Sequence, residues 1–78
     1  MKTVEVRPSQ KFAGAWIAFD APGVEPAFAT NDPKADAINY ARGRFGGSCG
    51  EIHVYDDAGT NIIDKIVMDE RMKYPHAD

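Results

Sequence analysis

The sequence contains a single cysteine, Cys49, in 78 residues, so no disulfide can form within the chain. Positive charge is also scarce, because nine lysines and arginines stand against twelve aspartates and glutamates. The formal net charge of −3 gives no electrostatic reason to expect a nucleic-acid or membrane-surface partner. No apolar run approaches the roughly 20 residues of a bilayer-spanning helix, and the N-terminus lacks the pattern of a signal peptide. These features predict a cytoplasmic protein.

The length of the chain limits it to one small domain. Its hydrophobic fraction of 44% and charged fraction of 27% are typical of a globular protein. A domain of this size buries only roughly 60–65% of its unfolded surface. We therefore expect a free energy of unfolding of a few kcal/mol, or a fold that depends on self-association.

Four segments have the patterns of β-strands. Residues 3–7 alternate between valine and polar residues, and residues 15–19 are apolar on both sides, as in a strand that is central or covered on both faces. Residues 51–55 alternate again and lead into a glycine-containing loop, which predicts a hairpin with Ile62–Met68. The aliphatic residues of Ile62–Met68 also fit a helical stripe, so the choice between strand and helix stays open there. Pro26 leaves residues 24–30 unassigned, although Phe28 is expected to reach the core.

A helix is predicted to begin at Asp32 and Pro33. Aspartate accepts a hydrogen bond from a free amide of the first turn, and proline at the first helical position loses no hydrogen bond. The apolar stripe that follows comprises Ala37, Ile38, Ala41 and Phe45. Gly46 and Gly47 are expected to provide the left-handed backbone that ends the helix.

These elements predict an α+β fold of the ββαββ type, with a four-stranded antiparallel sheet and one helix packed on one face. Residues 1–68 are expected to form a single domain, and residues 69–78 a flexible C-terminal tail. The predicted contact centre between helix and sheet comprises Trp16, Ile38, Ala41, Phe45, Ile52 and Val54.

Several short motifs resemble those of a known family. In chain order they are Trp16-x-Ala18, Phe28-Ala29-Thr30, Lys34-Ala35-Asp36-Ala37-Ile38-x-x-Ala41-Arg42 and Gly50-Glu51-Ile52-His53-Val54, with Gly59 downstream. This order resembles the bacterial domain of unknown function family 2188, from about Val4 to Ile62. The resemblance implies the fold and no activity. A weaker similarity, carried by residues 19–24 and the short helix after them, is to HicB-type antitoxins.

Candidate catalytic and metal-binding residues are few. Cys49 lies in a glycine loop with His53 four residues on, but it follows a helix C-terminus, whereas activated thiols favour the positive N-terminal end. Cys49 and His53 lack the three or four ligands of a zinc site. His76, Asp78, Asp56 and Asp57 have no metal-binding spacing either. We therefore expect no enzyme activity, no catalytic residue, no cofactor and no metal.

The sheet face away from the helix is the predicted interaction face. It is expected to carry Ile17, Phe19, His53 and Tyr55. A contiguous apolar patch of this kind generally marks association, which predicts a protein-interaction module that acts as a homodimer or binds a protein partner. The alternative is an antitoxin-like or nucleic-acid-associated regulator, because aromatic residues on an open sheet can stack bases. The sequence leaves the partner and the biological role open.

Overall fold

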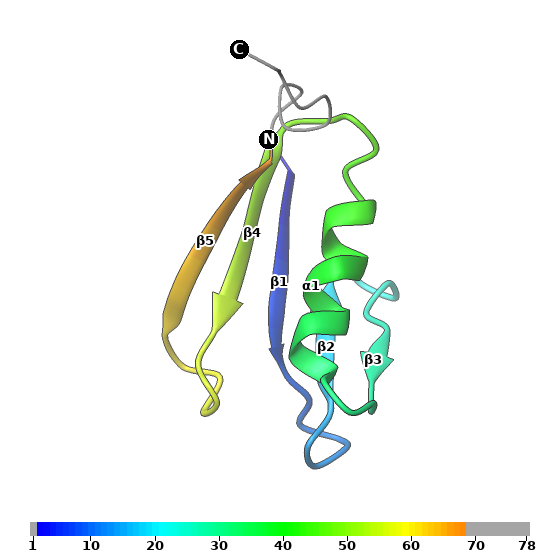
Figure 1. The fold of residues 1–78 in the computed structure, drawn as a ribbon, viewed down its shortest axis with the longest axis vertical. Helices are drawn as coiled ribbons and strands as arrows, with labels where there is room; N and C mark the ends of the chain where they lie inside the picture. Colours follow the sequence, from blue (N-terminus) through cyan, green and yellow to red (C-terminus); the bar gives the residue numbers. More distant parts are fainter. Residues whose placement is uncertain (1, 69–78) are drawn as a thin grey trace.

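The computed structural model describes residues 2–68 and contains one helix and five strands within that range (Figure 1). The predicted tail, residues 69–78, lies outside the described residues. The elements are β1 (Lys2–Pro8), β2 (Trp16–Phe19), β3 (Ala27–Phe28), α1 (Pro33–Gly43), β4 (Gly50–Tyr55) and β5 (Ile62–Met68). No helix in the described part of the chain is both long and apolar enough to cross a membrane.

The sheet has five strands in the order β3-β2-β1-β4-β5 and is mixed. The general α+β class is confirmed, but the prediction of a four-stranded antiparallel sheet is wrong in two respects. β1 pairs in parallel with β4, because the chain passes through α1 before β4 and so returns to the end of the sheet at which β1 begins. A short fifth strand, β3, pairs with β2 and places Phe28 opposite Trp16.

The helix begins where the sequence predicts. The Asp32 carboxylate accepts a hydrogen bond from the Ala35 amide at 3.3 Å, and Pro33 occupies the first turn. The helix ends at Gly43, and Gly46 and Gly47 have positive φ angles of 55° and 97°. Phe45 therefore lies in the turn after the helix instead of on its last turn.

The core lies between α1 and one face of the sheet. Its buried apolar side chains are Val4, Val6, Ala15, Trp16, Ala18, Ala37, Ala41, Phe45, Ile52 and Val54. Five of the six residues predicted for the contact centre belong to it, whereas Ile38 is half-buried at its margin. Alanines at positions 37 and 41 allow the helix to approach the sheet closely.

Strand β5 is confirmed as a strand, and it forms an antiparallel hairpin with β4. The register shifts between Val54 and Tyr55, which interrupts the regular pairing of the two strands. In Figure 1, α1 lies in front of β2, between β1 and β3, while β5 lies away from it at the far edge of the sheet. One edge of the sheet is therefore a long strand that the helix does not cover.

Candidate functional site

The predicted interaction face lies on the side of the sheet opposite α1, which we call the open face. Trp16 and Ala18 of β2, and Ile52 and Val54 of β4, are buried beneath the helix. Because side chains alternate along a strand, the other residues of these two strands point to the open face. The four predicted residues, all half-buried, are Ile17, Phe19, His53 and Tyr55.

Charged side chains of β1 divide the open face, because β1 lies between β2 and β4 and carries Glu5 and Arg7 on this face. Glu5 is in register with Phe19 on one side and with His53 on the other. Arg7 Nη1 is 3.0 Å from Glu5 Oε1, and the Arg7 guanidinium lies 5.1 Å from the centre of the Phe19 ring. The expectation of a contiguous apolar patch is therefore wrong. The second face of β2 is covered in part by the long side chain of Arg7 instead of by another layer.

A second polar pair lies along β4. His53 Nε2 and Glu51 Oε1 are 2.8 Å apart, and both side chains are partly exposed. The hydrogen bond from His53 is the largest influence on the carboxyl group of Glu51, and together with the charges of His53 and Lys65 it lowers the pKa of Glu51 despite partial desolvation. His53 is thus engaged by a neighbour on its own strand.

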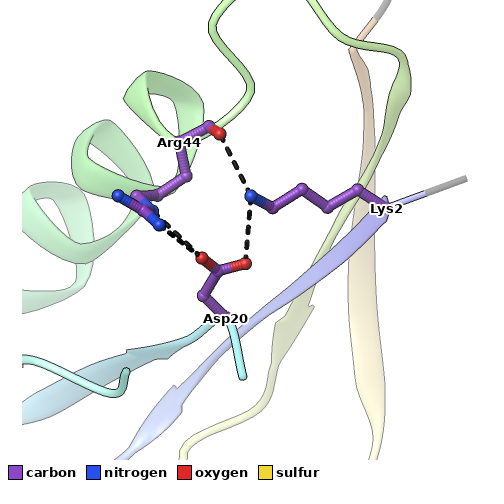
Figure 2. A network of polar contacts seen from close by, with 3 residues as sticks. All are labelled: Lys2, Asp20 and Arg44. Atoms are coloured by element: carbon purple, nitrogen blue, oxygen red, sulfur yellow. Dashed lines mark hydrogen bonds and ion pairs between the residues drawn. The ribbon is translucent and has the colours of Figure 1, made fainter. Parts of the chain in front are cut away.

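An ion network joins the start of β1 and the end of β2 to the C-terminus of α1 (Figure 2). The Asp20 side chain is 7% exposed, and its Oδ2 lies 2.9 Å from Arg44 Nη2 while its Oδ1 lies 3.2 Å from Lys2 Nζ. Lys2 Nζ also donates to the Arg44 carbonyl oxygen at 3.1 Å. Desolvation raises the pKa of Asp20, but the hydrogen bonds and charges of Arg44 and Lys2 outweigh it and hold the pKa below its usual value. The network has a structural role, since the single Asp20 carboxylate pairs with both cations and so joins β1 and β2 to the C-terminus of α1.

The outer edge of β5 is a second candidate surface. The strand is seven residues long, and no strand within residues 2–68 pairs with its outer side. Ile62, Ile63 and Val67 are 41%, 57% and 53% exposed. In the sequence, the aliphatic residues of Ile62–Met68 fit a helical stripe nearly as well as a strand, and the glycine loop before them favoured the strand. An exposed apolar edge strand is a template for pairing with another chain.

A hollow of about 520 Å³ lies at the other end of β1, between the β1–β2 and β4–β5 loops. Its lining mixes Lys11 with Glu25 and Asp57, and includes Phe12, which is 60% exposed. Within residues 2–68 no buried side-chain nitrogen or oxygen lacks a hydrogen-bond partner. The hollow therefore presents no unsatisfied buried polar group to a ligand.

Cys49 and His53, the two residues considered for both catalysis and metal binding, are not brought together, and the further candidates His76 and Asp78 lie outside the described residues. Cys49 is exposed in the loop before β4, and the hydrogen-bond partner of His53 is Glu51. The described part of the chain contains no group of three or more histidines, cysteines, aspartates or glutamates placed to hold a metal ion. Asp56 instead organises its hairpin loop by accepting hydrogen bonds from the backbone amides of Thr60 and Asn61, at 3.0 and 3.4 Å.

The basic residues lie on different surfaces. Arg7 lies on the open face, whereas Lys34 lies on the helix side, 5.3 Å above the Trp16 ring. Arg44 is paired with Asp20, and Lys11 belongs to the β1–β2 loop. A nucleic-acid surface would gather such cations on one face.

Comparison with family models, with curated proteins and with solved structures found no match to this chain. The resemblance to family 2188 therefore stays a prediction, as does the weaker similarity to HicB-type antitoxins. In the fold, the tryptophan motif of that resemblance lies in β2, its helix motif in α1 and its glycine-led motif in β4.

Proposed function

We propose that the chain is a small, non-enzymatic bacterial protein-interaction module that works as a homodimer, with the outer edge of β5 as its contact surface. The observation that carries this proposal is the combination of a seven-residue edge strand with three exposed aliphatic side chains, Ile62, Ile63 and Val67. Backbone amides and carbonyls on such an edge can form a full ladder with a second strand, and the apolar side chains gain burial at the same time.

The other edge of the sheet supports the choice of β5. β3 has two residues and is preceded by Pro26, whose nitrogen cannot donate a hydrogen bond. Both features oppose pairing at that edge. Of the two sheet edges, β5 therefore offers the longer ladder and the larger exposed apolar surface.

The size of the domain gives association a thermodynamic advantage. A 78-residue chain buries a small share of its surface, and its core lies on one side of the sheet only. A partner that binds the folded state alone adds to its stability by mass action. We also propose that the protein works in the cytoplasm, where the exposed thiol of Cys49 stays reduced.

The test is sedimentation velocity between about 1 and 300 µM, a range chosen to bracket micromolar dissociation constants. We expect the native chain to change from monomer to dimer across this range. Val67→Lys should shift the change to higher concentration. Phe12→Lys is the matched control, because Phe12 is also exposed but lies in the β1–β2 loop, away from β5. A native chain that stays monomeric throughout would overturn the proposal.

A further inference from the structure

We infer that two copies of this chain pair their β5 strands antiparallel about a two-fold axis at Ile66, so that their sheets join into one. This inference rests on the proposed homodimer and specifies its geometry. Ile66 is half-buried at the margin of the core cluster, next to the edge that α1 leaves uncovered. The partner is a second copy of the chain, and the register of the two strands defines the dimer.

Symmetry restricts the possible registers. Two edge strands that extend one sheet and are related by a two-fold axis run antiparallel, with the axis perpendicular to the sheet. The axis keeps each face of the sheet on its own side, so both helices lie on the same side of the joined sheet. Residues that oppose each other across the new ladder must then come from the same face. Each allowed register therefore places one residue of β5 opposite itself.

The charges of β5 distinguish among the registers that pair at least five of its residues. These registers are centred on Asp64, Lys65 or Ile66. The first places Asp64 opposite the same carboxylate of the second copy, and the second places Lys65 opposite the same ammonium group. Like charges directly opposite one another destabilise a sheet. The register centred on Ile66 places an apolar residue opposite itself and brings no like charges into opposition.

The Ile66 register also places Lys65 favourably. It opposes Lys65 to Val67 of the second copy, and the aliphatic stem of lysine can cover that exposed valine. Within one chain, Val67 is in register with Glu51 of β4. The Lys65 ammonium group therefore extends toward the Glu51 carboxylate of the second copy. Two such contacts form, one on each side of the axis, and the remaining pair opposes Asp64 to Met68.

The outer edges of the joined sheet are poorly suited to pairing with further copies of the chain. Its two outer edges are the β3 strands, which have two residues each and follow a proline. A two-fold contact that consumes both β5 edges closes the assembly at two copies. Pairing five residues from each chain buries less than the roughly 800 Å² per partner of a standard interface. We therefore expect a dissociation constant on the order of 10 µM.

The first experiment compares two charges at one exposed position, Val67→Glu and Val67→Lys, by sedimentation equilibrium. In the Ile66 register, position 67 lies opposite Lys65 of the second copy. A glutamate there meets an opposite charge, and a lysine there meets a like charge. We expect Val67→Glu to keep the dissociation constant within about threefold of the native value and Val67→Lys to raise it about tenfold or more, since two pairs change together. Within one chain the electrostatic preference is the opposite, because position 67 lies opposite Glu51, which favours lysine there over glutamate. Loss of the dimer in Val67→Lys therefore cannot be assigned to repulsion within its own hairpin.

The second experiment reads the register by disulfide formation in a Cys49→Ser background. Lys65→Cys and Val67→Cys are made as separate proteins, and both positions are exposed. Opposed residues in an antiparallel pair have Cα atoms about 4.5–5.5 Å apart, which suits a disulfide, whereas diagonal neighbours are about 7–8 Å apart. We expect the mixture to form a mixed disulfide at least about tenfold faster than either protein forms its own.

The outcomes separate this inference from the proposed function. A monomeric native chain overturns both. A dimer in which Lys65→Cys alone cross-links fastest has its axis at Lys65, which overturns the Ile66 register while the homodimer stands. A dimer with no cross-linking at either position, and with equal effects of the two Val67 substitutions, has its axis at Asp64 or uses another surface, and either arrangement overturns the Ile66 register. Faster cross-linking of the mixture, together with the charge asymmetry, supports the inference.

Discussion

The aromatic ring of Phe45 occupies the space that a side chain at position 50 would need. A Cβ atom on Gly50 would overlap both the Phe45 ring and the carbonyl oxygen of Lys2, its neighbour in the parallel register. Phe45 is 3% exposed and closes the end of the core where α1 leads into β4. The glycine thus allows the turn after the helix to pack onto the start of the parallel strand pair.

Gly50→Ala should therefore destabilise the fold by at least about 2 kcal/mol, because one of the two overlaps is with backbone, which cannot rotate away. The measurement is urea unfolding followed by the fluorescence of Trp16. Gly43→Ala is the matched control, since a Cβ at Gly43 meets no atom within 4 Å and the residue ends a helix. It should leave stability unchanged or raise it by up to about 1 kcal/mol. Equal midpoints for the two variants would contradict this account of Gly50.

Phe45→Ala should cost about 3–5 kcal/mol, because it removes a buried ring and leaves a cavity against Gly50. For a domain of this size that loss is comparable with the whole free energy of unfolding. Far-ultraviolet circular dichroism at 25 °C should show a largely unfolded chain. Phe12→Ala removes the same ring from a position that is 60% exposed and should change stability by less than about 0.5 kcal/mol. A folded, cooperative Phe45→Ala protein would show that this ring is not central to the core.

Local signals in the sequence predicted the helix and the strands themselves better than they predicted which strands lie side by side. Asp32 and Pro33 marked the helix start correctly because capping is decided by residues within one turn. Likewise, the glycine loop before Ile62–Met68 correctly indicated an antiparallel hairpin with β4. The parallel pairing of β1 with β4 was missed, since strand alternation says which face a residue takes but not which strand lies beside it.

The predicted interaction face shows the same limit. Alternation placed Ile17 and Phe19 on the face away from α1, as the structure has them. The two apolar faces of β2 suggested a strand that is central or covered on both faces. β2 does lie between two other strands, β1 and β3, but Arg7 and Glu5 of β1 divide the open face beside it. The extent of exposure along the outer edge of β5 could not be predicted, because exposure at an edge depends on the strand order, which is a tertiary property.

Stability should fall in acid, and Asp20 should account for part of the fall. The folded-state pKa of Asp20 is lowered, so its ionised form contributes stability above the unfolded pKa of about 3.9, and this contribution is lost as pH falls from about 4 through the folded value. Asp20→Asn should be less stable than the native chain at pH 7, with a smaller loss between pH 5 and pH 2. Urea unfolding across that range measures both effects. Asp57→Asn is the control, because Asp57 is exposed and forms no ion pair with residues 2–68. An Asp20→Asn profile parallel to the native one would remove Asp20 as a source of the acid dependence.

Phe19→Glu distinguishes association through the open face from association through β5. The sequence alone predicted a homodimer that covers Ile17, Phe19 and Tyr55, and a glutamate in the middle of such an interface would be buried without a partner, which is costly. In the structure Phe19 lies next to Arg7 and opposite Glu5, so a carboxylate at position 19 stays half-exposed and shares the Arg7 guanidinium group with Glu5. We therefore expect Phe19→Glu to keep the dissociation constant of the dimer within about threefold, while Val67→Lys raises it about tenfold. Sedimentation equilibrium on both variants makes the comparison. The reverse order, with Phe19→Glu monomeric and Val67→Lys dimeric, would return the contact to the open face and leave the β5 edge without a role in association.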